Sequence, residues 1–190
     1  MKTLCVYCSS SSRLDKKYYD AAEALGIGLA QHGWALVYGG GKAGLMGSVA
    51  RSAKTAGGYV IGVIPEFMKA RELAFTDADE LITVTTMHER KQIMAEKADA
   101  FVTLPGGIGT LEELSEIMTA RYLNLMTKPI ILVNQDGFYD DLLRFFDKMI
   151  QEKFKSAGMS DIVTVAKTVE EVWTVLQNPR PYQADAFWRM

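Results

Sequence analysis

Residues 100–113, AFVTLPGGIGTLEE, decide the fold of this chain. They begin with a short apolar run, residues 100–104, that has the length and composition of a buried β-strand. A proline and three glycines follow within five residues, and after them comes a stretch with the apolar periodicity of a helix. A buried strand that leads through a tight turn into a helix is the repeating unit of a parallel α/β sheet.

The same alternation runs along the whole chain. Strands are expected at residues 3–8, 35–38, 59–64, 81–85, 100–104, 130–133 and 162–165, and helices at residues 16–32, 45–56, 87–97, 111–125, 139–152 and 169–177. The strands are rich in Val, Ile and Leu throughout, which is typical of a sheet covered by helices on both faces. The sequence therefore predicts a single doubly wound, Rossmann-like α/β domain with a mostly parallel sheet over residues 1–178. Pro179 and Pro181 end the last helix, and residues 179–190 are expected to form an irregular surface tail.

Composition narrows the classes of function. The 190 residues are 48% hydrophobic and 23% charged, which are ordinary values for one globular domain. A formal net charge of −2 argues against nucleic-acid binding, which needs a clustered basic face. No run of about 18 apolar residues is present to cross a membrane, and the N-terminus leads directly into a strand instead of a signal peptide. A cytoplasmic protein is expected.

The cysteines and histidines carry no strong signal for chemistry. Cys5 and Cys8 form a C-x-x-C pattern, which in a cytosolic α/β protein can mark a redox site. That motif needs both sulfurs at a helix start, whereas residues three apart on a strand point to opposite faces. We therefore expect two buried, free thiols. His32 and His88 stand apart from any cysteine or carboxylate cluster, so no metal site is expected.

The turns at the carboxyl ends of the strands are the places to look for a ligand site. The strongest candidate is the turn at residues 106–110, because glycines let the backbone approach a ligand and direct consecutive N–H groups into one concavity. The start of the following helix favours an anion, above all a phosphate. The alternative is an ordinary turn whose helix begins at Thr110, with Thr110 and Glu113 forming a capping box. A proline and three glycines in five residues favour the phosphate turn.

A second glycine-rich segment, residues 39–47, follows the second strand. It is not a P-loop, because Ala43 stands where a Ser or Thr is required after the Gly-Lys pair. It is not a dinucleotide fingerprint either, because that motif follows the first strand. Its glycines permit close approach of a sugar, a base or the neighbouring phosphate turn, with tight helix–sheet packing as the alternative.

Charged residues follow two further strands. Arg90 and Lys91 flank the inward apolar stripe of the helix that begins at Met87, where a charge is costly unless it is paired. Both side chains could extend outward from the edge of the stripe, but the position beside the phosphate turn favours a site role for Arg90. Glu66, after the third strand, is either a solvated loop carboxylate or a hydrogen-bond partner for a ligand hydroxyl. The turn at residues 134–137 is interpreted as purely structural.

Four of these segments together resemble the Lonely Guy (LOG) family of cytokinin riboside 5′-monophosphate phosphoribohydrolases, which are widely mislabelled as lysine decarboxylases. They are YGGG…GLMG at residues 38–47, GVIPE at 62–66, MHERK at 87–91 and PGGIGTLEE at 105–113. The similarity runs in order and with matching spacing over residues 3–155. P-G-G-x-G-T-x-x-E together with M-H-x-R-K is specific to the family.

The resemblance implies a Rossmann-like homodimer that hydrolyses the N-glycosidic bond of adenosine 5′-monophosphate or its N6-substituted forms, releasing free base and ribose 5-phosphate. No metal or organic cofactor is implied. Arg90 and Glu113 fall on the catalytic pair of the family. The residues expected to bind the nucleoside monophosphate are Gly40, Gly41, Glu66, Met87, Lys91, Gly106, Gly107, Ile108, Gly109 and Thr110.

The chain also departs from the family pattern. Ser9 replaces a glycine that usually follows the first strand, and residues 120–126 differ from the stretch common in plant members, which leaves the base preference open. One alternative function is a non-catalytic Rossmann-like carrier of a nucleotide or nucleotide-like cofactor, but binding alone would not require both Arg90 and Glu113. Lysine decarboxylation is disfavoured because pyridoxal phosphate chemistry needs a Schiff-base lysine and a pyridinium partner, for which the sequence has no motif.

Overall fold

The computed structural model describes residues 1–154 and 162–180 of the chain. Within these residues the chain forms a seven-stranded sheet in the order β4-β3-β2-β1-β5-β6-β7, and every pair of neighbouring strands is parallel. The strands are β1 (Lys2–Tyr7), β2 (Trp34–Tyr38), β3 (Val60–Pro65), β4 (Glu80–Val84), β5 (Ala100–Thr103), β6 (Ile130–Val133) and β7 (Thr164–Ala166). The predicted fold class, a doubly wound α/β sheet, is confirmed.

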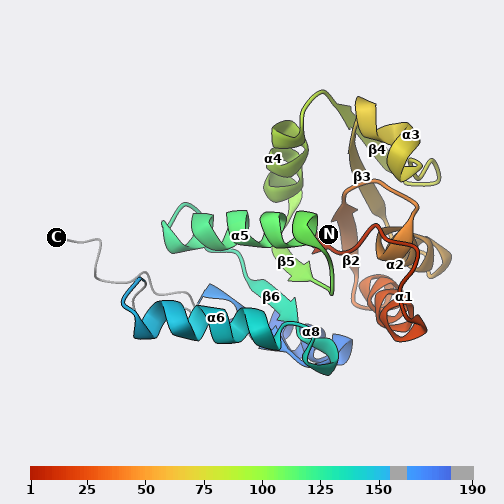
Figure 1. The fold of residues 1–190 in the computed structure, drawn as a ribbon. Helices are drawn as coiled ribbons and strands as arrows, with labels where there is room; N and C mark the ends of the chain where they lie inside the picture. Colours follow the sequence, from red (N-terminus) through yellow and green to blue (C-terminus); the bar gives the residue numbers. More distant parts are fainter. Residues whose placement is uncertain (155–161, 181–190) are drawn as a thin grey trace.

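Helices cover both faces of this sheet. One face carries α1 (Lys16–Gln31), α2 (Gly44–Thr55) and α8 (Val169–Gln177). The other face carries α4 (Met87–Lys97), α5 (Ile108–Tyr122) and α6 (Asp140–Gln151). In Figure 1, α4 lies to the left of β3 and β4, α5 lies above β6, and α1 and α2 lie to the right of the strands. The shorter elements are η1 (Glu66–Met68), α3 (Lys69–Glu72) and η2 (Gln135–Gly137).

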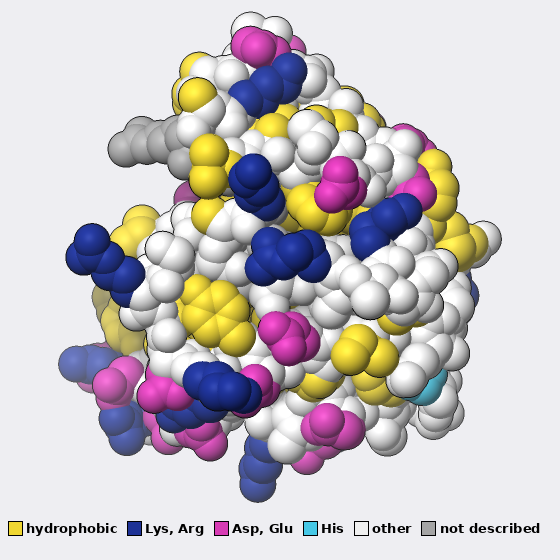
Figure 2. Space-filling view, turned by 90° about the vertical axis from the view of Figure 1, so that its right-hand side faces the viewer, with side chains coloured by type: hydrophobic (Ala, Val, Ile, Leu, Met, Phe, Trp, Pro, Cys, Tyr) yellow, Lys and Arg dark blue, Asp and Glu magenta, His cyan; other side chains and the backbone are white. Residues whose placement is uncertain are grey.

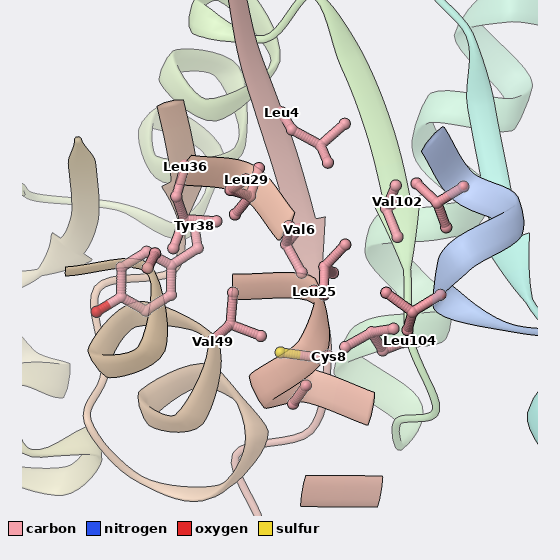
Figure 3. Packing of buried hydrophobic residues seen from close by; sticks show 14 of the residues in the cluster. Leu4, Val6, Cys8, Leu25, Leu29, Leu36, Tyr38, Val49, Val102 and Leu104 are labelled. Atoms are coloured by element: carbon pink, nitrogen blue, oxygen red, sulfur yellow. The ribbon is translucent and has the colours of Figure 1, made fainter. Parts of the chain in front are cut away.

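The core consists of two apolar layers, one on each face of the sheet. Leu4, Val6 and Cys8 belong to the layer that includes α1 and α2, while Cys5 and Tyr7 belong to the opposite layer. Figure 3 shows the first layer, where Leu4, Val6 and Cys8 pack with Leu25 and Leu29 of α1 and Val49 of α2. The strict alternation along β1 places the two thiols on opposite faces. The prediction of buried, free cysteines is confirmed, because both are buried and unbridged.

The order of the strands creates a crevice between the two halves of the sheet. After β1 the chain turns into α1 on one face, and after β5, the neighbour of β1, it turns into α5 on the other face. In doubly wound folds this switch point is where ligands bind, because the two connections leave in opposite directions. The segment at residues 8–11 and the turn at residues 107–110 therefore line one crevice.

Two predicted boundaries are wrong near this crevice. Helix α5 begins at Ile108 instead of residue 111, with Gly107 as N-cap, so the capping box of Thr110 and Glu113 does not form. The backbone N–H of Leu111 already donates to the carbonyl of Gly107 at 3.0 Å, which brings the glycine-rich residues into the first helical turn. The short helical segment of η1 and α3 had been expected as a loop.

Helix α5 ends at Tyr122, three residues before its predicted end, and β7 begins two residues after its predicted start. The other predicted boundaries agree within one residue. The expected tail lies outside the described residues, except for residues 179–180, and the domain limit at residue 178 stays a prediction. No described helix is long and apolar enough to cross a bilayer. On the face shown in Figure 2, Lys and Arg side chains are spread among acidic and apolar ones.

Candidate active site

A cleft of about 370 Å³ opens at the carboxyl ends of β1 and β5. Its lining consists of residues from the β1–α1 segment, α2, η1, α4 and the start of α5: Cys8, Ser9, Ser10, Ser11, Met46, Met68, Met87, Arg90, Gly107, Ile108, Gly109, Thr110, Glu112 and Glu113. A second hollow of equal volume lies between α1 and the start of α8, where Lys17 and Asp136 pair with each other at 3.0 Å. The cleft at the ends of β1 and β5 brings together both predicted catalytic residues and most of the phosphate turn.

The first turn of α5 forms one wall of the cleft. Its N-cap, Gly107, makes no side-chain capping bond. At Gly107 and Gly109, no atom of the described residues lies within 4 Å of the place where a Cβ would stand, apart from chain neighbours and the helix itself. The wall is therefore built from backbone next to open space, and the positive end of the helix dipole faces the cleft. This arrangement suits a phosphate group.

Gly106 has a different task from the two glycines that follow it. A Cβ on Gly106 would lie 2.2 Å from the hydroxyl oxygen of Thr110, whose residue is buried. The turn therefore closes over the Thr110 side chain, which only a glycine at position 106 permits. Gly106 supports the phosphate turn from behind and does not line the cleft.

Arg90 is a buried charge at the base of the opposite wall. Only 4% of the residue is exposed. Its Nε donates to the carbonyl of Val63 at 3.1 Å and its Nη2 to the carbonyl of Gly39 at 2.6 Å, so the ends of two strands hold the guanidinium. Its Nη1 lies 3.7 Å from the sulfur of Met68 and 3.8 Å from that of Met87. Charge-assisted bonds to two carbonyls offset part of the cost of burial and fix the side chain.

The start of α4 fixes where Arg90 emerges. Thr86 and Glu89 form a capping box, in which the hydroxyl of Thr86 accepts from the N–H of Glu89 at 3.1 Å and the Glu89 carboxylate accepts from the N–H of Thr86 at 3.1 Å. The carboxylate also accepts from the N–H of Thr85 at 2.8 Å. This capping box was not predicted, although its T-x-x-E signature is present in the sequence.

Gly39 was not predicted as a site residue, yet the position of Arg90 depends on it. A Cβ on Gly39 would lie 2.0 Å from Nη2 of Arg90. The next two glycines serve packing: Gly40 has φ of +76° and lies against β3, and Gly41 forms an isolated bridge with Ala74. Neither lines the cleft, and their contact with substrate stays a prediction.

The rest of the second glycine segment holds the loop after β1. The N–H groups of Leu45 and Met46, at the start of α2, donate to the carbonyl of Ser9 at 2.9 and 3.4 Å. Gly44 has φ of +57°, and a Cβ there would lie 2.5 Å from the backbone carbon of Ser10. The start of α2 therefore binds the protein's own backbone, and its packing places Ser9, Ser10 and Ser11 in the cleft. These serines were missed as lining residues, although their position after β1 was the available signal.

Glu113 enters the same cleft from α5. Its carboxylate is near enough to the end of β1 that its charge adds to the effect of burial in raising the pKa of Cys8. It acts in the same direction on the pKa of Tyr7, where burial is again the largest cause. The structure thus brings Arg90 and Glu113 together beside the first turn of α5. Their catalytic roles stay predictions.

Two predicted contacts lie outside the cleft. The ammonium of Lys91 pairs with Glu112 and, at 2.9 Å, with Glu116. The side chain of Glu66 is 70% exposed and pairs with Lys69 at 2.8 Å. No group of three or more His, Cys, Asp or Glu residues in the described ranges could hold a metal ion.

The buried thiols lead to a simple prediction about reactivity. Burial raises the pKa of both Cys5 and Cys8 well above the ordinary thiol value, so neither forms a thiolate near neutral pH. At pH 8 we expect the folded protein to react with Ellman's reagent at least about 100-fold more slowly than the unfolded protein. In guanidinium chloride both cysteines of the chain should react. Rapid modification of either thiol in the folded protein would contradict this prediction.

Comparison with known proteins identifies relatives over the whole chain. Residues 46–176 match the protein family described as "Possible lysine decarboxylase". The chain is 42% identical over 189 residues to cytokinin riboside 5′-monophosphate phosphoribohydrolase LOG2 of Arabidopsis thaliana, a match that covers 100% of this chain and 89% of that protein. It is 43% identical over 188 residues to the phosphoribohydrolase LOG of Oryza sativa subsp. japonica, covering 98% of this chain and 78% of that one.

Solved structures give the same architecture. The molybdenum cofactor carrier protein of Chlamydomonas reinhardtii has a TM-score of 0.72 at 25% identity, covering 93% of this chain and 96% of that chain. DNA processing protein A of Helicobacter pylori has a TM-score of 0.60 at 10% identity, and the match covers 93% of this chain and 80% of that chain. At this identity the similarity shows the fold alone. Together with the motifs around the cleft, the near-complete similarity to curated LOG proteins confirms the predicted resemblance, and this chain belongs to the LOG family.

Proposed function

We propose that this protein hydrolyses the N-glycosidic bond of adenosine 5′-monophosphate and of its N6-substituted forms, releasing free base and ribose 5-phosphate. The observation that carries the proposal is the placement of Arg90 and Glu113 in one cleft with the backbone wall of residues 107–110. The names of the curated relatives agree with it. We further propose that it acts as a homodimer in the cytoplasm, as the family resemblance implies.

The phosphate end of the substrate positions the reacting bond. The 5′-phosphate binds at the start of α5, where backbone N–H groups and the helix dipole attract it. Binding energy from this remote group holds the ribose in place, which contributes to catalysis by making the reaction effectively intramolecular. The nucleoside that lacks the phosphate should therefore be a poor substrate.

The two charged side chains act on the charge that develops as the bond breaks. Hydrolysis passes through an oxocarbenium-like state, with positive charge on the ribose and electrons leaving on the base. The Glu113 carboxylate favours the positive ribose and orients the attacking water. The guanidinium of Arg90, held by carbonyls of β3 and the β2 end, is a preorganised positive charge that favours the leaving base.

A carrier function is the second candidate, favoured by the structural similarity to the molybdenum cofactor carrier protein. A carrier would bind a nucleotide-like cofactor in the cleft and leave it intact. An enzyme and a carrier therefore differ in whether a bound nucleotide is cleaved.

The test is to incubate the protein with adenosine 5′-monophosphate or an N6-prenylated form and to measure free base by chromatography. We expect base release at least about 1,000-fold faster than in the double variant Arg90→Ala, Glu113→Ala. Binding without release in the unchanged protein would support the carrier. Equal rates with the monophosphate and with the nucleoside lacking phosphate would contradict the phosphate anchor.

A further inference from the structure

Lys91 is the neighbour of Arg90 on α4, but its side chain leaves the helix on another side. Its ammonium bonds to the carboxylate of Glu112 and lies 2.9 Å from that of Glu116, both on α5. The two carboxylates are four residues apart and so lie on one face of the helix. Only 15% of the Lys91 side chain is exposed, less than either carboxylate.

Glu112 brings a negative charge to a place where the substrate brings another. It lines the cleft together with the backbone wall of residues 107–110. A carboxylate within about 8 Å of a bound phosphate repels it appreciably unless a cation lies between or beside them. The hydrogen bond to Glu112, followed by the effect of Glu116, raises the pKa of Lys91, so its positive charge persists at neutral pH.

Lys91 also connects the two helices that carry the predicted catalytic pair. Arg90 is the residue before it on α4, and Glu113 follows its partner Glu112 on α5. Lys91 is largely buried in this contact, whereas Glu112 and Glu116 are 52% and 44% exposed, so the contact links the two helices without locking them. The same contact therefore sets the charge beside the phosphate wall and joins the helices that carry Arg90 and Glu113.

We propose that Lys91 is a positioning residue that cancels the charges of Glu112 and Glu116 beside the phosphate wall, and that it acts on the substrate through them. The inference rests on the proposed function for its effect on catalysis. It differs from the direct ligand contact that the family resemblance implies for Lys91, because the ammonium would act through Glu112 and Glu116, with which it pairs.

The test compares Lys91→Met with the matched control Lys97→Met, which removes another lysine of α4 whose partner, Glu80, lies on β4 at 3.4 Å. We expect Lys91→Met to raise KM for the nucleoside monophosphate about tenfold. The value for the nucleoside lacking phosphate should change less than about twofold, because that substrate carries no charge to repel. Lys91→Arg, which keeps the cation, should reverse most of the KM increase seen in Lys91→Met, and Lys97→Met should change neither KM value.

The decisive variant removes the two carboxylates as well as the cation, so that no uncompensated negative charge is left to repel the phosphate. In the triple variant Lys91→Met, Glu112→Gln, Glu116→Gln, we expect the Kd for ribose 5-phosphate, measured by calorimetry, to return to within about threefold of the original protein. Failure of this rescue, with all variants folded by thermal denaturation, would overturn the proposal, since a direct contact of Lys91 cannot be restored by losing carboxylates. Equal behaviour of Lys91→Met and Lys97→Met would overturn it too. Because calorimetry needs no turnover, it tests Lys91 even if the unchanged protein releases no base and the proposed function fails.

Discussion

Replacing Gly39 by alanine is expected to lower the rate of base release at least about 100-fold while leaving the protein folded. The added methyl group would stand 2.0 Å from Nη2 of Arg90 and 3.2 Å from the sulfur of Met46. The atoms that must move are the ends of flexible side chains, so the backbone keeps its course. The guanidinium loses its bond to the Gly39 carbonyl and leaves its place in the cleft. We expect the free energy of unfolding to fall by about 1–3 kcal/mol.

Two comparisons show whether the effect runs through Arg90. Gly33→Ala is the matched control. The φ of Gly33, +70°, strains an alanine by about 1–2 kcal/mol, but its surroundings are open. Gly33 precedes the amino end of β2, whereas Gly39 follows the carboxyl end of the same strand. The activity of Gly33→Ala should be unchanged. In an Arg90→Met background, Gly39→Ala should cause no further loss of activity, since the group it displaces is already gone. A further loss as large as in the unchanged protein would contradict the steric argument.

Replacing Glu113 by glutamine is expected to reduce kcat about 100- to 1,000-fold with KM nearly unchanged. Glutamine keeps the shape of the side chain but removes the negative charge that stabilises the positive ribose. The interaction exists mainly in the transition state, so kcat and kcat/KM should fall together. Steady-state kinetics of base release measure both constants.

The control for Glu113→Gln is Glu96→Gln, which changes an exposed carboxylate on α4 that accepts a hydrogen bond from Gln92 at 2.8 Å. Its kcat should stay within about twofold of the original value. Thermal denaturation should show both variants folded. A Glu113→Gln protein that keeps a tenth or more of the original kcat would rule out the carboxylate as a catalytic group.

Local patterns in the sequence were sufficient for the architecture. Short apolar runs predicted all seven strands. The five inner strands are largely buried, which excludes most polar residues, whereas the edge strands β4 and β7 are only partly buried. The glycine-rich turn predicted one wall of the cleft for a similarly local reason: close backbone approach and a helix start are properties of consecutive residues. The LOG-family motifs added Arg90 and Glu113, and the structure brings both to that wall.

Other features depend on residues far apart in the chain. Helix α5 starts earlier than predicted because glycine's low helix propensity is a weak preference that tertiary context overrides. The divergent residues 120–126 had been associated with the base end of the substrate. Tyr122 lines a separate groove between α5 and α6, and a helix of 15 residues separates it from Gly107 of the same chain by about 22 Å. The association with the base stays a prediction.

Arg90 and Lys91, which are neighbours on α4, show most clearly what the sequence determined and what the tertiary structure decided. The sequence by itself determined that Arg90 and Lys91 flank an apolar stripe of a helix that follows a strand, since helical periodicity and apolar runs are local properties. It did not determine which of them enters the cleft. The tertiary structure decided this, because the partners that compensate each charge come from elsewhere: strand-end carbonyls from β2 and β3 for Arg90, and two carboxylates of α5 for Lys91. A buried charge adopts the position where distant groups satisfy it, and those groups meet only when the sheet has assembled.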